Sequence, residues 1–327
     1  MSWADARPSP RPYTTSGAAR NNDEPKRDDK SRASRGKRRS GFAVSRDGAA
    51  IFFEVLGQPH PAPTLILCDG LGCDGYVWKY LQWALADTYR IVHMNYRGHG
   101  QTPLPADFGQ VHIADFAADV LSVMDASETE RAVIVGHSLG VQIALEIYRQ
   151  ARERCLSLIL ICGSYRNPLR TFKGKETLGE LLPLIQMAVS KVPRLVGAFW
   201  KRLLPLDLSF QIAKHFELNG ELVHREDFVP YLEALSRMDP RMFVATMAAA
   251  AQHDAQDVLT DISVPTLLVT ARHDTFTPMA LSLEMQEKIA GSELHIVEAG
   301  THTAPIERPA EVTQVVQRFL ERRVFAP

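Results

Sequence analysis

Long apolar runs are absent from the chain, and this absence limits the classes of protein it can belong to. No run of 18 apolar residues occurs among the 327 residues, so no segment is a candidate for a membrane-spanning helix. The pair Arg38-Arg39 is followed by SGFAVSRDGAA, without the apolar stretch that an export signal requires. These absences predict a soluble protein that is not exported by the twin-arginine route.

Cysteine is also scarce, and its pattern excludes the common metal and redox motifs. The four cysteines are Cys68, Cys73, Cys155 and Cys162, and their spacings match no zinc or redox signature. The metal-binding pattern HExxH is absent as well. Cysteines that lie in predicted buried strands favour reduced thiols in or near the core and a cytoplasmic location.

Charge is distributed unevenly along the chain. Residues 1–40 hold 11 Lys and Arg against 5 Asp and Glu, whereas the remainder holds 26 against 33 and is therefore acidic. A basic tail could contact nucleic acid or anionic lipid. Its Pro, Ser, Arg and Asp content is, however, more typical of a solvated, disordered leader. We therefore expect no nucleic-acid partner.

From Gly41 onward, short β-branched runs alternate with longer amphipathic stretches. This alternation is typical of a parallel sheet flanked by helices. Segments such as DFAADVLSVMDA, at 115–126, have apolar residues three and four positions apart, as a helix requires. We expect an α/β fold with a doubly wound, mostly parallel sheet. The expected strands are 49–57, 64–70, 90–96, 131–136, 155–163, 265–271 and 293–299.

The interval 165–256 interrupts this alternation. It contains no convincing strand, and its helical stretches are separated by several prolines. We therefore expect a helical insertion at 165–256 between two segments of the core, 41–164 and 257–327. The basic leader, 1–40, completes the predicted domain organisation.

The pattern GHSLG, at 136–140, makes Ser138 the candidate nucleophile. In GxSxG the serine lies on a strained turn between a strand and a helix, where glycines two residues away on each side avoid clashes. The preceding RAVIV is a predicted strand, and the following VQIALEIYRQ is a predicted helix. A structural turn serine is the alternative, but this context favours a nucleophile.

Two further residues have the positions that a general base and its carboxylate need. His302, in EAGTHTAPIERP, follows the last predicted strand, and Asp274 ends PTLLVTARHD just beyond another. Ligands approach open α/β sheets at the carboxyl ends of the strands, so both loops face the expected site. The order Ser138, Asp274, His302 is the one expected for this arrangement.

Backbone N–H groups are the predicted stabilisers of a developing oxyanion. The Leu139 amide lies at the start of the helix that follows Ser138, where the helix dipole is positive. The Leu71 amide is assigned as the second donor because the loop DGLGCDGYVW, at 69–78, has glycines that let the backbone approach a ligand. A plain glycine-rich turn is the alternative for this loop.

Five motifs in order, DGLGCDGYVW, NYRGHGQT, GHSLG, ARHDTFTP and THTAPIERP, make residues 41–327 resemble the α/β-hydrolase superfamily. The resemblance is to its capped esterases, lipases and haloperoxidase-like enzymes. It implies Ser138 as nucleophile, His302 as base, Asp274 as acid, Leu71 and Leu139 as oxyanion donors, and no metal or organic cofactor. The sequence departs from the common pattern at Asp69, where His is frequent, and at Asn95, where Asp is frequent.

The resemblance implies an activity as well as a fold. We expect a serine hydrolase that cleaves carboxylic esters of apolar or medium-sized acyl groups, with a small ester-like molecule as its partner. Perhydrolysis, lactone opening and carbon–carbon hydrolysis on the same triad stay open, as does a slow ligand-binding protein. The insertion should cover the site as a cap, and Phe199 and Trp200 within it either line an acyl pocket or pack the cap onto the core.

Overall fold

The computed structural model describes residues 38–108, 111–170, 177–216 and 223–326. The predicted leader, residues 1–40, lies almost entirely outside these ranges. The described residues form an eight-stranded sheet with the order β1-β2-β4-β3-β5-β6-β7-β8. The strands are β1 (Arg39–Val44), β2 (Ala50–Gly57), β3 (Thr64–Cys68), β4 (Arg90–Met94), β5 (Ala132–His137), β6 (Cys155–Ile161), β7 (Thr266–Ala271) and β8 (Glu293–Val297).

The sheet is mostly parallel, as the sequence predicts, and only β2 pairs antiparallel with its neighbours β1 and β4. In the parallel part, Leu65 of β3 lies opposite Ile91 of β4 on one side and Val133 of β5 on the other. Every residue of β3 and β5 is buried. Helices cover both faces of the sheet, which explains why these strands are continuous apolar runs without alternation.

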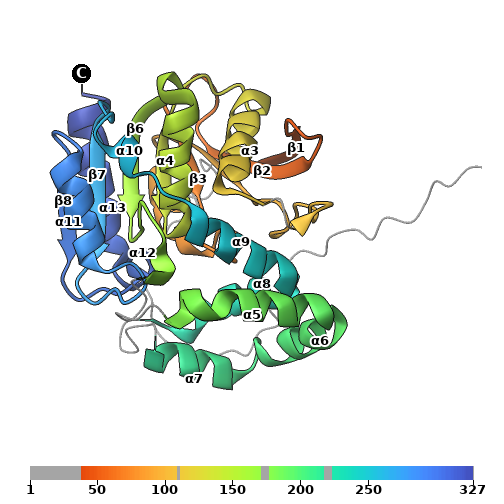
Figure 1. The fold of residues 1–327 in the computed structure, drawn as a ribbon. Coiled ribbons are helices and arrows are strands. Elements are labelled where there is room, and N and C mark those ends of the chain that lie inside the picture. The colour runs from red at the N-terminus through yellow and green to blue at the C-terminus, as the bar shows by residue number, and fades with distance from the viewer. Residues whose placement is uncertain (1–37, 109–110, 171–176, 217–222, 327) are drawn as a thin grey trace, which may run out of the picture. The chain divides into compact units, whose positions relative to one another are not determined.

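Helices α3, α4 and α11 pack on one face of the sheet, and α13 packs on the other (Figure 1). Helix α2 packs on the same face as α13. Their bounds are α2 (Leu81–Leu85), α3 (Ile113–Ala126), α4 (Leu139–Ala151), α11 (Met279–Lys288) and α13 (Pro309–Phe319). Short helical segments lie between or after these elements: η1 (Tyr76–Trp78), η3 (Arg152–Arg154), η4 (Pro168–Arg170), α10 (Gln256–Leu259), α12 (Ala304–Glu307) and η6 (Leu320–Val324).

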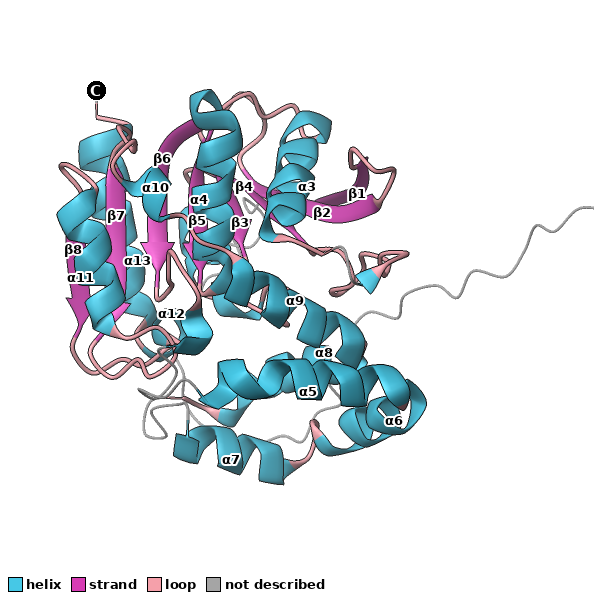
Figure 2. Cartoon of the chain, viewed as in Figure 1, coloured by secondary structure: helices cyan, strands magenta, loops and turns pink. Residues whose placement is uncertain are grey.

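Between β6 and β7, the described residues contain helices and no strand, which agrees with the predicted insertion. These helices are α5 (Thr177–Lys191), α6 (Pro193–Leu203), α7 (Asp207–Phe216), α8 (Arg225–Arg237) and α9 (Pro240–Gln252). Figure 2 shows them together beyond the arrowheads of the strands, and we call this group the cap. In the part of the chain that the structure describes, no helix has the length and apolar character needed to cross a membrane.

Strand β1 was not among the expected strands. It begins at Arg39, inside the stretch assigned to the leader, and it pairs with β2 over six residues. Ala43 is its only buried residue. An edge strand with so few buried positions has a weak apolar pattern, which explains why sequence periodicity does not predict it.

Candidate active site

Ser138 occupies a strained turn between β5 and α4. Its backbone torsions, φ 56° and ψ −116°, are ones that residues with a side chain rarely adopt. A β-carbon on Gly136 would lie 2.3 Å from the carbonyl oxygen of Gly140, and one on Gly140 would lie 2.1 Å from that of Cys68. Both glycines are therefore needed to hold Ser138 at the carboxyl end of the sheet.

The side chains of Ser138, His302 and Asp274 form one chain of hydrogen bonds. Ser138 Oγ donates to Nε2 of His302 across 2.8 Å, and Nδ1–H of His302 donates to Oδ2 of Asp274 across 2.9 Å. The three groups come from the loops after β5, β8 and β7. The structure therefore brings together the three side chains that the sequence motifs select.

Asp274 is held by its own loop as well as by His302. The backbone N–H groups of Phe276 and Thr277 donate to its Oδ1 across 2.8 and 2.9 Å, and the Thr277 hydroxyl donates to its Oδ2 across 2.8 Å. Burial raises the pKa of this carboxyl, but His302 and these hydrogen bonds together lower the pKa of Asp274 below its usual value. An ionised Asp274 favours the His302 tautomer that keeps a lone pair on Nε2, facing Ser138.

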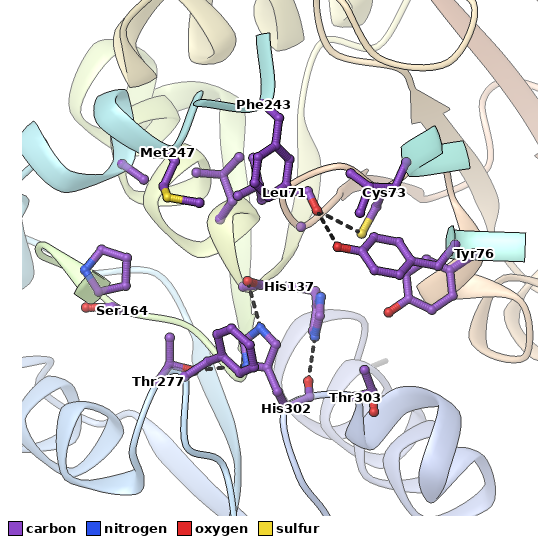
Figure 3. A pocket seen from close by; sticks show the side chains of 18 of the residues that line it. Leu71, Cys73, Tyr76, His137, Ser164, Phe243, Met247, Thr277, His302 and Thr303 are labelled. Carbon is purple, nitrogen blue, oxygen red and sulfur yellow. Dashed lines mark hydrogen bonds between the residues drawn. The ribbon is translucent and has the colours of Figure 1, made fainter. Parts of the chain in front are cut away.

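A second histidine, His137, supports the backbone of the first. Its Nε2–H donates to the carbonyl oxygen of His302 across 2.8 Å, and the two ring centroids lie 5.2 Å apart (Figure 3). Burial, followed by the proximity of His302, lowers the pKa of His137 to about 3. The ring is therefore uncharged near neutral pH and adds no charge beside His302. Sequence analysis assigned no role to His137, because GxSxG leaves that position open.

Leu71 and Leu139, the predicted oxyanion donors, line the same cavity as Ser138. Leu139 is the first residue of α4, so its N–H has no acceptor inside the helix. The loop that carries Leu71 passes close to Ser138, since a β-carbon on Gly70 would lie 3.2 Å from the β-carbon of Ser138. The carbonyl oxygen of Leu71 accepts a hydrogen bond from the Tyr231 hydroxyl at 3.4 Å, which joins this loop to the cap.

The loop that carries Leu71 is also anchored by a buried pair that sequence analysis did not predict. Oδ2 of Asp69 lies 2.8 Å from Nε2 of His93, and the two side chains are 1% and 9% exposed. Burial lowers the pKa of His93, but the charge of Asp69 and their hydrogen bond outweigh it and raise this pKa. The Gly72 N–H donates to Nε2 of His99 across 3.3 Å. The unusual Asp69 thus has a matching partner on β4.

Asn95, the other departure from the common pattern, shapes the loop after β4. Its Oδ1 accepts a hydrogen bond from the Gln101 N–H at 3.0 Å, and its carbonyl oxygen accepts one from the Thr102 hydroxyl at 2.6 Å. A β-carbon on Gly100 would lie 2.4 Å from Oδ1. Asn95 is therefore part of a tight turn.

A cavity of about 570 Å³ lies between these residues and the cap. Its volume is within the range of about 300 to 1,000 Å³ that is usual for small-molecule sites. Helices α8 and α9 supply seven residues of its apolar wall, and no Asp, Glu, Lys or Arg is among the described residues that line it. The cap contributes Phe228, Tyr231, Leu232, Leu235, Phe243, Met247 and Ala250 from these two helices. The cavity is therefore suited to an uncharged, largely apolar ligand.

The two aromatic residues singled out in the insertion have different surroundings. Trp200 packs against Phe243 with ring centroids 5.2 Å apart, and its indole N–H donates to the carbonyl oxygen of Leu235 across 2.7 Å. Phe199 is 67% exposed. From the segment 178–210, the cavity lining includes Leu204 and Ser209 but neither aromatic residue. Trp200 therefore packs the cap, and Phe199 faces outward.

The cysteines are separate from the hydrogen-bond chain of Ser138, His302 and Asp274. Among the described residues, they and other possible metal ligands form no cluster. All four cysteines are free and buried, and burial raises the pKa of the Cys155 thiol to about 12. Cys73 lines the cavity, and burial likewise raises its pKa. Within the described ranges, no group of three His, Cys, Asp or Glu residues is arranged to hold a metal ion.

A family model described as "alpha/beta hydrolase fold" matches residues 63–309. The chain belongs to the α/β-hydrolase family. A protein of Rhizobium rhizogenes with the provisional name carbamate hydrolase RutD is 29% identical over 290 residues, which cover 83% of this chain and 98% of that protein. The 3-oxoadipate enol-lactonase 1 of Acinetobacter baylyi is 24% identical over 280 residues, which cover 85% and 96%.

Solved structures of other α/β-hydrolases have the same fold. The enol-lactonase from Burkholderia xenovorans superposes with a TM-score of 0.69 at 21% identity, over 86% of this chain and all of that one. An esterase from Exiguobacterium antarcticum superposes with a TM-score of 0.68 at 21% identity, over 86% and 98%. The names of these relatives therefore include more than one class of substrate.

Proposed function

We propose that this α/β-hydrolase cleaves carboxylic esters of apolar or medium-sized acyl groups through an acyl-enzyme on Ser138. The observation that carries the proposal is the hydrogen-bond chain from Ser138 through His302 to Asp274 at the wall of an uncharged cavity. A serine hydroxyl needs a base to become nucleophilic, and the base needs an orienting carboxylate. These three groups meet both needs.

In the first half of the reaction, Ser138 Oγ attacks the ester carbonyl carbon while its proton passes to Nε2 of His302. Asp274 stabilises the resulting imidazolium through its bond to Nδ1. The negative charge that develops on the carbonyl oxygen faces the N–H groups of Leu71 and Leu139. When the intermediate collapses, the bond to the leaving alkoxide breaks, and His302 protonates that oxygen to release the alcohol.

In the second half, water replaces the alcohol. His302 removes a proton from the water, whose oxygen attacks the acyl carbon and forms a second tetrahedral intermediate. Collapse of this intermediate breaks the bond to Ser138 Oγ, which recovers its proton from His302, and the carboxylic acid leaves. The net reaction consumes one ester and one water and yields one acid and one alcohol.

The cavity lining supports an uncharged substrate over an anionic one. Burying a carboxylate without a cationic partner is unfavourable, and no Lys or Arg is among the described lining residues. A 3-oxoadipate enol-lactone retains a carboxylate, so the substrate named for the Acinetobacter relative fits this lining poorly. Carbamate has few atoms and would leave most of about 570 Å³ unfilled.

An uncharged lactone is the second candidate substrate. A lactone is a cyclic ester, so the same attack on its carbonyl opens the ring and leaves the alcohol attached to the acyl group. The observation that favours it is the 24% identity to an enol-lactonase over 85% of this chain. A panel that contains p-nitrophenyl esters of increasing chain length and uncharged lactones separates the two candidates by kcat/KM.

The decisive experiment for the nucleophile compares the wild type with Ser138→Ala. We expect the substitution to lower kcat on the best ester by roughly 10⁴ to 10⁶ and to abolish covalent labelling by a fluorophosphonate. The melting temperature should change little, because the side chain shrinks by one hydroxyl. Persistent labelling of the variant would show that another residue is the nucleophile. A wild type that retains an ester without turning it over would favour a ligand-binding protein.

A further inference from the structure

The outer side of the cap exposes apolar side chains far more than the rest of the protein does. Of 14 large hydrophobic residues that are exposed in the described chain, nine lie between positions 181 and 208. The most exposed of them are Leu195, at 72%, Phe199, at 67%, Leu208, at 65%, and Leu184, at 57%. We call the exposed apolar residues of 181–208 the cap outer face. Such concentrations commonly mark an interaction surface.

The packing of the cap does not require this outer face. Helices α5 and α6 already bury an inner side, where Leu182 and Val189 of α5 and Val196 of α6 pack with residues of α9. Figure 1 shows α5, α6 and α7 on the side of the cap that is farther from the sheet, with α9 between the sheet and α5. The exposed apolar residues of 181–208 are therefore not needed for this packing.

Basic side chains accompany the cap outer face. Lys191, Arg194, Lys201 and Arg202 are exposed on or next to α5 and α6. The segment 181–208 contains a single acidic residue, Asp207, and this carboxylate is bound by Arg225 at 2.7 Å. The cluster is local, because residues 41–327 as a whole carry 26 Lys and Arg against 33 Asp and Glu.

Apolar side chains mixed with Lys and Arg on surface helices match the interface of an anionic phospholipid bilayer. The apolar groups enter the acyl boundary while the cations contact the headgroups. A second copy of the chain is a poorer match, since two such faces would bring like charges together. We propose that the cap outer face docks on anionic phospholipid membranes.

Docking there would place the cavity close to the bilayer. Leu204 and Ser209 line the cavity, whereas Leu206 and Leu208, between them in the sequence, are 46% and 65% exposed on the outer face. One short segment therefore borders both the cavity and the membrane-facing surface. Resting on the proposed function, this arrangement identifies the substrates as apolar esters that partition into the bilayer.

The test measures co-sedimentation of the full chain with vesicles at low ionic strength. One set of vesicles contains phosphatidylcholine alone, and the other contains equal parts of phosphatidylcholine and phosphatidylglycerol. We compare the wild type with Leu195→Ser/Phe199→Ser, and with the control Val44→Ser/Leu104→Ser. The control removes apolar side chains that are 73% and 46% exposed on the core.

We expect the wild type to bind the phosphatidylglycerol vesicles at least about tenfold more tightly than the neutral ones. Leu195→Ser/Phe199→Ser should weaken this binding at least about tenfold, and the control should not. Lys201→Glu/Arg202→Glu should weaken the preference for anionic vesicles. All variants should hydrolyse p-nitrophenyl butyrate at the wild-type rate without vesicles.

Absence of wild-type binding to the anionic vesicles would overturn the proposal. Equal binding by Leu195→Ser/Phe199→Ser would overturn it too, because another surface would then be responsible. A dimer detected by light scattering that this variant dissociates, without vesicle binding, would assign the face to a second copy of the chain. Vesicle binding that depends on Leu195 and Phe199 without ester turnover would retain the docking site and remove the proposed function instead.

Discussion

Asp274 lies at the opposite end of β7 from three nearby aspartates. It lies after the carboxyl end of the strand and contacts His302, whereas Asp254, Asp257 and Asp261 precede the strand. Asp274→Asn would keep the size of the side chain but favour the wrong His302 tautomer. We expect kcat on one activated ester to fall by roughly 10³ to 10⁴.

Asp254→Asn, Asp257→Asn and Asp261→Asn serve as the controls for this substitution. Asp254 accepts a hydrogen bond from the Gln256 N–H, and Asp257 pairs with Arg149 at 2.6 Å, so neither side chain points to the site. All three variants should stay near the wild-type kcat. Retention of more than about a tenth of kcat by Asp274→Asn, with collapse of a control, would contradict the assignment.

The lowered pKa of His137 predicts a loss of stability at acidic pH. Its pKa is lowered from 6.5 to about 3 in the folded protein, so only the unfolded chain takes up this proton as the pH falls below 6.5. The resulting loss of unfolding free energy approaches about 1.4 kcal/mol per pH unit well below pH 6.5. Between pH 7 and pH 5, urea titrations should therefore give a slope that is about 1 kcal/mol per pH unit steeper in the wild type than in His137→Gln. Equal slopes in both proteins would contradict the neutral assignment of His137.

His93 predicts the opposite pH dependence of stability and therefore serves as the comparison for His137. Its folded pKa is raised above 6.5 by Asp69, so the stability from this pair is fully present below pH 6.5. It is lost as the pH rises through the higher folded value. Relative to His93→Gln, the wild type should therefore lose part of its advantage between pH 6.5 and alkaline pH. If the stability difference between the wild type and His93→Gln instead grew with pH, the buried His93 ring would be uncharged in the folded protein.

At the scale of single elements, the turn at Ser138 depends on glycine while a helix of the cap does not. A β-carbon on Gly140 would meet backbone atoms of β3 that cannot move without disturbing the sheet. Gly197, inside α6, has no atom within 4 Å of the equivalent point. We expect Gly140→Ala to cost about 3 kcal/mol or more and to abolish activity. Gly197→Ala should add roughly 0.5 to 1 kcal/mol, and thermal unfolding of both variants checks the contrast.

Element prediction succeeded where the signal is local and failed where it depends on neighbours. The strand, turn and helix around Ser138 are encoded within about twenty consecutive residues, so the motif alone predicts them. The Asp69–His93 pair joins side chains 24 positions apart, and the sequence does not indicate His93 as the partner of Asp69 until β3 and β4 are known to be adjacent. The antiparallel pairing of β2 likewise follows from its position in the sheet and not from its own sequence.

At the scale of the whole molecule, the mostly parallel sheet and the inserted cap were predictable from the alternation of patterns along the chain, whereas the order of the strands within the sheet was not predicted. Ser138, Asp274 and His302 lie close together because parallel strands present their carboxyl ends at one edge of the sheet. The exposed outer face of the cap was not predictable. An apolar helix residue can face either the core or a partner, and the sequence pattern is the same in both cases.

The boundary between leader and fold gives a prediction for the whole chain. Residues 1–37 are polar and charged and lack the periodicity of a packed element, so their removal should leave melting temperature and activity unchanged. Removal of residues 1–44 would also delete β1, whose six residues pair with β2, and would separate the Phe42 ring from Phe52 at 5.5 Å. We expect this longer deletion to lower the melting temperature by about 5 °C or more, since it strips β2 of one edge partner. Differential scanning calorimetry of the two truncated proteins beside the full chain is the measurement. A shorter deletion that already lowers the melting temperature would assign a structural role to the leader, and a longer one without effect would make β1 dispensable.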